Sequence, residues 1–267
     1  MPTYRLNIEY EGTRYHGWQE QKNARSVTGE LRRAIEEAGG AVKEIGGSGR
    51  TDAGVHALAQ VAHLRLAKPV EPGAFRRAVN DLLPPDIHVL GMAAVPNEFH
   101  ARHSAVSRSY LYQISRRRTA FAKRWVWWVK RPLDVERMAE AAASLPGRHD
   151  FRLFCERPAE QPSTIVVVEG VEVAADGALI LVRLAASHFL WKMVRRVVGT
   201  LVQVGAGELD RSSFLSLLAT EGPKGKRGLP AEWTAPPSGL FLERVLYPGD
   251  APLGPVQPVT PVAAEEW

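Results

Sequence analysis

Apolar and polar positions alternate along the chain in segments that switch between the period of a strand and that of a helix. Residues 4–10 alternate as a strand does, whereas residues 27–39 repeat apolar positions at helical spacing, with Ser26 as N-cap and Gly39-Gly40 as the stop. The same reasoning predicts further strands at 42–45, 57–66, 87–95, 107–115, 125–129 and 240–246. It predicts further helices at 75–83, 135–145, 189–204 and 212–219, and a hairpin of 165–173 with 179–185 across Asp176-Gly177.

The order strand, helix, strand occurs in both halves of the chain, which indicates an α/β (α+β) fold. A chain of 267 residues is long enough for two domains, and the order permits two ferredoxin-like units joined by their sheets. We expect an N-terminal α/β domain over residues 1–103 and a C-terminal α/β domain over residues 104–248. Repeated prolines after residue 248 predict that the tail, residues 249–267, is disordered.

The segment with the clearest chemical potential is the octapeptide at residues 49–56, Gly-Arg-Thr-Asp-Ala-Gly-Val-His. Gly49 and Gly54 flank Asp52, so the backbone can bend sharply and approach a ligand closely. Arg50 can offer a planar donor fork to a phosphate. A carboxylate beside a phosphate-binding group indicates chemistry on a nucleotide. The alternative is an Asx turn, in which Asp52 only bonds its own backbone.

Two familiar glycine loops are excluded by the residues around this octapeptide. A P-loop needs Lys and then Ser or Thr after its second glycine, but Val55 and His56 stand there. A dinucleotide-binding loop that began at Gly47 would need its third glycine at Asp52.

Asp52 and His56 of the octapeptide and His63 just after it are plausible metal ligands. If residues 57–66 form a strand, however, His56 and His63 are seven positions apart and point to opposite faces. We therefore expect no metal site.

Composition places the chain among ordinary globular proteins, with 45% hydrophobic and 24% charged residues. No apolar run reaches the length of a membrane span, and no signal peptide precedes the first strand. Cys155 is the single cysteine, which excludes an internal disulfide and predicts an inert thiol. These features predict a cytoplasmic protein.

Positive charge is concentrated in residues 100–131, which hold nine Lys or Arg and no Asp or Glu, although the net charge of the whole chain is only +5. The aromatic residues interleaved with these cations are Tyr110, Tyr112, Phe121, Trp125, Trp127 and Trp128. Cations that bind phosphates and rings that stack on bases suit a nucleic-acid surface. The alternative is a solvated basic face beside a buried aromatic strand. A second basic group, Lys224, Lys226 and Arg227, is explained as readily by solubility.

The octapeptide also resembles the signature of the TruA family, the tRNA pseudouridine synthases that act on the anticodon stem-loop. Other segments match in the same order, and the resemblance spans about residues 3 to 248. These segments are Tyr10-Glu11-Gly12, Tyr15-His16-Gly17-Trp18-Gln19, Phe99-His100-Ala101-Arg102, Arg108-Ser109-Tyr110-Leu111-Tyr112, Met193-Val194-Arg195 and Gly239-Leu240.

The resemblance implies both a fold and an activity. The fold is two ferredoxin-like (RRM-like) domains with joined antiparallel or mixed sheets around a central active-site cleft, in a homodimer that grips tRNA. The activity is that of an isomerase, an intramolecular transferase that converts uridine to pseudouridine at tRNA positions 38, 39 and 40. That reaction needs no redox step, group donor or metal, so no cofactor is expected. The alternatives are a non-catalytic RNA-binding protein that keeps the fold and a metal-dependent nucleotide hydrolase.

Roles for individual residues also follow from the resemblance. Asp52 matches the nucleophile, Arg195 the arginine that pairs with it, and Tyr110 the tyrosine that stacks on the target base and can assist removal of the C5 proton. Spacing alone does not choose between Arg195 and Arg196. The residues expected to bind substrate are Arg50, Tyr110, Leu240, Arg102 and Arg108, together with Arg116, Arg117 and Arg118, which the charge pattern of residues 100–131 indicates.

Simpler explanations remain for three of these residues. Tyr110 and Leu240 are also typical of core positions, and Arg195 of a charged helix surface. The chain departs from the family pattern at His103, where phenylalanine is common, and at Thr28, where glutamine is usual. Residues 156–164 lack the arginine-containing pattern that often precedes the hairpin strand.

Overall fold

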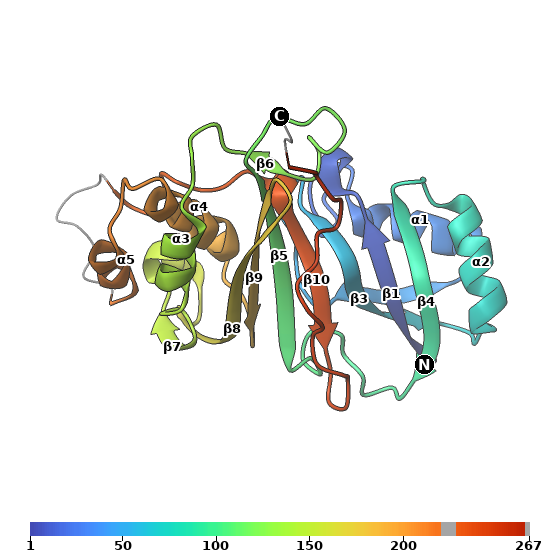
Figure 1. Cartoon of the computed structure of the whole chain (residues 1–267). Helices are drawn as coiled ribbons and strands as arrows, with labels where there is room; N and C mark the ends of the chain where they lie inside the picture. The colour runs from blue at the N-terminus through green and yellow to red at the C-terminus, as the bar shows by residue number, and fades with distance from the viewer. Residues whose placement is uncertain (220–227, 265–267) are drawn as a thin grey trace. The chain divides into compact units, whose positions relative to one another are not determined.

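The computed structural model describes residues 1–219 and 228–264 and has a mixed α/β fold (Figure 1). The chain divides into two compact units. The first comprises Met1–Val106 with Phe241–Ala251, and the second comprises Ser107–Leu240 with Pro252–Trp267. Within the described ranges, no helix is both long enough and apolar enough to cross a membrane.

The first unit is a mixed sheet with two helices. Its elements in chain order are β1 (Thr3–Tyr10), η1 (Gly12–Arg14), α1 (Val27–Glu37), β2 (Val42–Gly47), β3 (His56–Leu66), α2 (Pro72–Leu82), β4 (Ile87–Val95) and β10 (Leu240–Leu246). The sheet order is β4-β1-β3, and β2 and β10 both pair with β3. The β3–β10 pairing is parallel and the other pairings are antiparallel.

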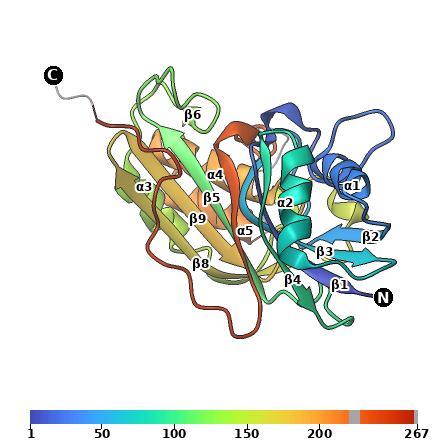
Figure 2. The same cartoon turned by 90° about the vertical axis from the view of Figure 1, so that its right-hand side faces the viewer.

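Both helices of the first unit begin at side-chain caps. Ser26 caps α1 by accepting a hydrogen bond from the Gly29 N–H, as the sequence predicts. The second helix begins at Pro72, three residues earlier than predicted, because Glu71 caps it and proline suits the first helical position. Figures 1 and 2 show α1 and α2 on the same side of the sheet.

The second unit repeats this combination of a sheet with helices. Its elements are β5 (Ser107–Ser115), β6 (Trp127–Trp128), α3 (Val135–Ala142), β7 (Gly147–Asp150), η2 (Arg152–Phe154), η3 (Pro158–Glu160), β8 (Ile165–Asp176), β9 (Leu179–Ala186), α4 (Met193–Gly205), α5 (Arg211–Leu218) and η4 (Pro237–Gly239). The strand order is β5-β9-β8-β7, and β6 pairs with β5 in parallel.

Most predicted elements of the second unit are confirmed, with three differences. The hairpin turns at Gly177, whose φ of 53° suits glycine, as predicted. The helix predicted from residue 189 begins only at Met193, because Lys192 has a φ of 61° and cannot continue a right-handed helix. The predicted strand 125–129 pairs over two residues only, and β7 was not predicted because its sequence, GRHD, is polar.

The proline-rich tail packs against the second unit through residue 264, which differs from the disorder that its composition predicts. Val262 is buried, and its carbonyl accepts a hydrogen bond of 2.8 Å from the Ala178 N–H. The buried guanidinium of Arg183 donates to the carbonyls of Gly254 and Pro255. In Figure 2 the tail crosses the sheet on the side away from α3 and α4. Valines between the prolines supply the apolar contacts that hold this extended segment.

The second basic group, Lys224, Lys226 and Arg227, lies outside the described residues.

Candidate active site

The glycine-rich octapeptide forms the loop between β2 and β3, and its base is fixed to β3. The Ser48 N–H donates to the Val61 carbonyl over 2.8 Å. The Gln60 side chain donates to the Gly49 carbonyl over 2.9 Å. Because Gln60 is completely buried, this amide anchors the loop to the interior of the first unit.

The residue before Asp52 is held from two sides. The hydroxyl of Thr51 lies 2.7 Å from the hydroxyl of Tyr10, and the Thr51 carbonyl accepts a hydrogen bond of 3.1 Å from the Trp18 N–H. Burial raises the pKa of the Tyr10 hydroxyl well above its ordinary value, so Tyr10 stays neutral and hydrogen-bonding. The backbone that carries Asp52 is therefore fixed on one side.

Glycines let the segment 12–18 press against the loop. A Cβ on Gly17 would lie 2.4 Å from the Thr51 carbonyl oxygen, and a Cβ on Gly12 would lie 2.0 Å from the Val55 carbonyl oxygen. Gly17 also has a φ of 91°, which a side chain would strain. Both positions therefore require glycine for the segment and the loop to touch.

Asp52 begins a tight turn whose closing hydrogen bond belongs to the backbone. The Val55 N–H donates to the Asp52 carbonyl over 3.2 Å, and Gly54 within the turn has a φ of 77°. The turn is therefore closed by a backbone hydrogen bond. Asp52 is half-buried, whereas Arg50 is exposed.

His56 is used in the interior of the first unit. Its Nδ1 accepts a hydrogen bond of 2.9 Å from the Gly12 N–H, and Glu11 lies 3.4 Å from the same atom. Its ring stacks on Phe241 with 4.8 Å between centroids. These contacts explain the histidine of the octapeptide as a structural residue.

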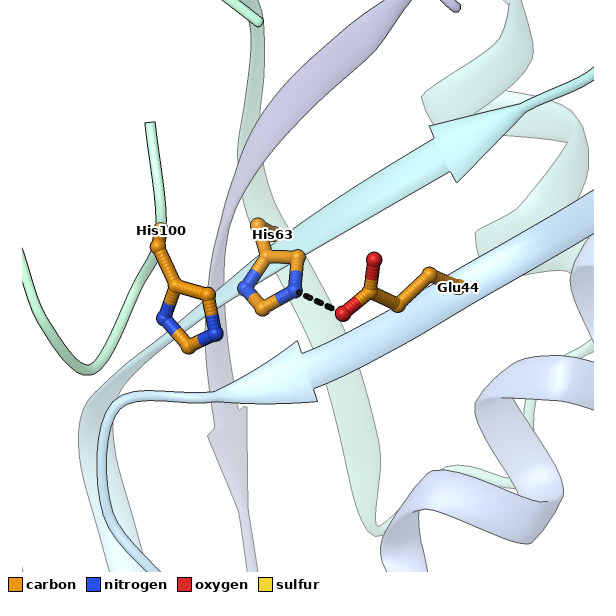
Figure 3. A group of neighbouring side chains, drawn as sticks. All are labelled: Glu44, His63 and His100. Carbon is orange, nitrogen blue, oxygen red and sulfur yellow. Dashed lines mark hydrogen bonds and ion pairs between the residues drawn. The ribbon is translucent and has the colours of Figure 1, made fainter. Parts of the chain in front are cut away.

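His63 lies in another group, with Glu44 and His100, whose ligand-type atoms are all within 4.8 Å of one another (Figure 3). The Nδ1 atom of His63 accepts the Ala101 N–H, and the Nδ1 atom of His100 accepts the Arg102 N–H. Each neutral ring therefore carries its proton on Nε2, and His63 directs that atom to Glu44 over 3.2 Å. A metal at Nε2 would have to displace these protons and break both backbone contacts, so we assign a hydrogen-bonded network.

Tyr110 lies on β5 in the second unit, opposite Leu184 of β9. Only 8% of it is exposed, and the edge of its ring meets Phe189 at 5.0 Å between centroids and 81° between planes. Phe189 precedes α4 by a few residues, so the connection from β9 to α4 determines one wall around Tyr110.

The neighbouring arginines of α4 have different surroundings. Arg196 is buried, donates to the Cys155 carbonyl over 2.5 Å and forms an ion pair with Glu156. Burial lowers the pKa of Arg196 from its ordinary value. Arg195 is only half-buried, and its Nε donates to the Ala235 carbonyl over 2.7 Å. Arg196 is thus a structural residue. The spacing of residues in the sequence alone does not distinguish it from Arg195.

Cys155 is buried beside this arginine. Burial raises the pKa of its thiol, which supports the predicted inert thiol.

Leu240 is 5% exposed and follows Gly239 at the start of β10. A Cβ on Gly239 would lie 2.6 Å from the Tyr112 ring, whose hydroxyl donates to the Pro236 carbonyl over 2.7 Å. Leu240 is therefore held by a closely packed turn. Whether it contacts a base stays a prediction.

The basic segment, residues 100–131, contains arginines that donate hydrogen bonds to backbone carbonyls and also contains exposed side chains. Arg116 donates to the Gly177 carbonyl and Arg117 to the Ala263 carbonyl. The guanidinium of Arg118 lies 5.9 Å from the centroid of the Trp128 ring, which is 41% exposed, and Phe121 is 92% exposed. The exposed rings and cations fit the predicted nucleic-acid surface.

The first two arginines of this segment differ in burial. Arg102 is exposed, whereas Arg108 is buried and donates to the Ser187 carbonyl over 2.8 Å. Their contacts with RNA stay predictions.

The predicted site residues fall into both units. Asp52, Arg50 and Arg102 belong to the first; the members in the second are Tyr110, Arg195, Leu240, Arg108, Arg116, Arg117 and Arg118. The residues that hold the loop have no role predicted from the sequence; they are Tyr10, Gly12, Gly17, Trp18 and Gln60. Gly12 and Gly17 could not be assigned this role from the sequence, because their partners Val55 and Thr51 lie more than thirty residues further along the chain.

Comparison with known proteins adds independent evidence. The family model described as tRNA pseudouridine synthase matches residues 7–104 and 141–248, more than half of the chain. These ranges include Asp52 and Arg195, whereas Tyr110 and residues 105–131 of the basic segment lie between them.

Relatives match over nearly the whole chain. A Maricaulis maris protein named tRNA pseudouridine synthase A is 42% identical over 94% of this chain and 100% of that protein. Proteins of the same name from Rhodopseudomonas palustris (strain BisB18) and Agrobacterium fabrum are 41% and 40% identical, over 92% and 94% of this chain and 100% and 95% of their own lengths. Among solved structures, the archaeal box H/ACA sRNP Nop10–Cbf5 complex matches over 74% of this chain and 43% of that chain, at 11% identity. Its TM-score of 0.35 is too low to indicate a shared fold. On the family model and these relatives, the chain belongs to the TruA family of tRNA pseudouridine synthases.

Proposed function

We propose that the chain acts as a synthase on uridines at positions 38, 39 and 40 in the anticodon stem-loop of tRNA, with Asp52 as the nucleophile. The observation that carries this proposal is the rigid loop around Asp52. Backbone hydrogen bonds, a buried amide and two close-packed glycines hold the loop in place. A carboxylate presented in this way suits covalent catalysis.

The reaction breaks the N1–C1′ bond, turns the base and joins C5 to C1′. Asp52 forms a covalent bond to C6 of the base or to C1′ of the ribose, which splits one difficult step into two easier ones. When the C5–C1′ bond is complete, C5 loses its proton and N1 gains one, so no electrons or groups are exchanged with a cofactor.

The other site residues act on this centre or on the RNA. Arg195 pairs with the Asp52 carboxylate and offsets its negative charge in the site. Tyr110 stacks on the target base and assists removal of the C5 proton, and Leu240 packs near the base. Arg50 helps the nucleotide to leave its stack, because a uridine inside a stem cannot be reached otherwise.

The basic segment binds the RNA backbone. Its arginines, with Arg102 and Arg108, contact phosphates, and the exposed rings stack on unpaired bases. The members of this surface are Arg102, Arg108, Arg116, Arg117 and Arg118.

We also propose two ferredoxin-like units around a cleft, in a cytoplasmic homodimer. The first unit supports this fold, because its elements follow the order βαββαβ with β1 between β3 and β4 and with β2 beside β3. The homodimer and the location rest on the family resemblance and on composition.

The second candidate function is a non-catalytic RNA-binding protein with the same fold. Mapping of pseudouridine in a tRNA transcript before and after incubation with the protein distinguishes the two functions. The proposal predicts new pseudouridine at one or more of positions 38, 39 and 40 without added cofactor. Tight binding with no new pseudouridine would favour the second function, and modification elsewhere in the tRNA would contradict the proposed positions.

A further inference from the structure

An exposed tryptophan in the second unit lies between two cations. Trp191 is 40% exposed and precedes α4 by two residues. The guanidinium of Arg157 lies 5.4 Å from the centroid of its ring, and the ammonium of Lys192 lies 5.6 Å from it. Both distances are within the range of a cation–π interaction. An exposed indole with two cations is the composition of a surface that stacks bases and binds phosphates.

The backbone is strained at both cations. In the described ranges, Arg157 and Lys192 are the only residues other than glycine with a positive φ, 50° and 61°. Left-handed conformations cost free energy at residues with a side chain, and such strain concentrates at functional sites. The two strained residues lie far apart in sequence, yet both flank Trp191.

A partly buried group of ion pairs around Glu156 fixes this arrangement. The Glu156 N–H donates to the Trp191 carbonyl over 2.9 Å, and one Glu156 oxygen lies 3.3 Å from the Lys192 ammonium. The other Glu156 oxygen pairs with buried Arg196. The segment before η3 and the segment before α4 are thereby held together, so Trp191 is presented on a preorganised support.

The same connection leads to residues of the proposed base site. Phe189, two positions before Trp191, meets the edge of Tyr110, and Arg195 lies in the first turn of α4. A nucleotide next to the target uridine would therefore lie near Trp191 if Tyr110 stacks on the target base.

One carboxylate on this surface competes with a phosphate. Glu160 lies 3.3 Å from the Arg157 guanidinium, and both side chains are more than 60% exposed. Such exposed pairs contribute little in water, so an RNA phosphate can replace Glu160 at Arg157.

We propose that Trp191, Arg157 and Lys192 form an RNA contact that binds a nucleotide adjacent to the target uridine. The base stacks on Trp191, and the two cations bind the neighbouring phosphates. This inference rests on the proposed function, because the position of Tyr110 connects the surface to the target base. It also restores an RNA contact to residues 156–164, where the family pattern is absent from the sequence.

Binding of a tRNA transcript tests the stacking. Trp191→Leu should weaken Kd about tenfold or more, as loss of one stacked base does, whereas Trp191→Phe keeps a ring and should stay within about threefold of the parent. The single-turnover rate at saturating RNA should stay within about twofold, because Trp191 does not touch the reacting atoms. A fall in that rate with unchanged Kd would overturn the proposal.

The salt dependence of RNA binding tests the role of the Lys192 charge, and a variant expected to bind RNA more tightly tests the role of Glu160. Lys192→Asn tolerates the left-handed conformation but lacks the charge, so it should lower the log–log salt slope by about 0.7 to 0.9. Arg137→Asn, at an exposed arginine of α3, is the matched control and should leave the slope unchanged. Glu160→Gln removes the competitor of the phosphate and should tighten binding about two- to threefold at low salt.

The inference would be overturned if folded Trp191→Leu and Lys192→Asn variants had the same Kd for tRNA and the same salt slope as the parent. This holds even if the parent protein makes pseudouridine. A changed mass in light scattering with unchanged RNA affinity would overturn it too and would assign the surface to a protein partner. Absence of pseudouridine from the parent reaction, with the binding effects intact, would contradict the proposed function instead.

Discussion

The hydroxyl of Tyr10 lies 2.7 Å from the hydroxyl of Thr51, and so connects the end of β1 to the residue before Asp52. The pair is buried, and the Thr51 carbonyl is held in turn by the Trp18 N–H. The position of the proposed nucleophile is thus determined by a strand more than forty residues away in sequence. A side chain that touches no substrate can therefore change the rate of the reaction.

Tyr10→Phe should lower the free energy of unfolding by about 1 kcal/mol and lower the single-turnover rate about tenfold, because the loop loses one restraint. The matched control is Tyr4→Phe in the same strand, whose hydroxyl bonds the backbone of Val70 instead. It should lose similar stability in urea unfolding with an unchanged rate. Equal rates for the two variants would show that the Tyr10 hydroxyl does not position Asp52.

Gly17→Ala should disrupt the loop, because its Cβ would lie 2.4 Å from the Thr51 carbonyl oxygen. Gly39→Ala is the matched control. Its φ of 87° is close to the 91° of Gly17, but nothing lies within 4 Å of its Cβ. The control should lose about 1–2 kcal/mol from backbone strain and keep its activity. Gly17→Ala should lose more stability and most activity in parallel thermal-melting and turnover assays, and similar losses in both variants would indicate that only φ matters.

The elements were largely predictable from the sequence because their signals are local. The strands 87–95, 107–115 and 240–246 occur with the predicted bounds. The tail was wrongly expected to be disordered, since the contacts of Val262 and Arg183 depend on residues remote in sequence. Helix α4 begins later than predicted, because helical periodicity does not reveal the left-handed conformation of Lys192.

For the site, the octapeptide identified Asp52 as the candidate nucleophile. The supports of the loop could not be predicted, because Tyr10 and Gln60 are ordinary strand residues until the fold brings them to Thr51 and Gly49. Arg195 and Arg196 were distinguishable only by resemblance, and burial now separates them.

Substitution of Arg196 should lower the stability of the protein, whereas substitution of Arg195 should lower its activity. Arg196→Ala should lower the free energy of unfolding by about 2–3 kcal/mol, because the Cys155 carbonyl and Glu156 lose a buried charged donor. Arg195→Ala should remain near parental stability and have very little activity, whereas Arg195→Lys keeps the charge and should retain part of it. Urea unfolding and turnover measured on all three variants check this. Near-normal rates for both Arg195 variants would remove Arg195 from the catalytic centre.

The stability of the protein should decrease as pH falls from about 7 to about 5 through His100. Burial, followed by the nearby rings of His63 and His103, lowers the pKa of His100 from its ordinary value. In this range the unfolded chain binds a proton at His100 more readily than the folded chain does, so acidification favours unfolding. His100→Gln should flatten this part of the pH dependence in urea unfolding at several pH values. A parallel pH dependence in parent and variant would exclude His100 as its source.

Release of tritium from tRNA labelled at uracil C5 tests the role of Asp52 most directly, because formation of the C5–C1′ bond expels that hydrogen. Asp52→Asn preserves size and hydrogen-bonding shape but removes the nucleophilic oxygen anion. We expect the parent protein to release tritium into water. We expect the variant to bind tRNA within about tenfold of the parent, a difference of about 1.4 kcal/mol, and to release essentially none. Tritium release by Asp52→Asn at a near-parental rate would contradict the assignment of Asp52 as the nucleophile.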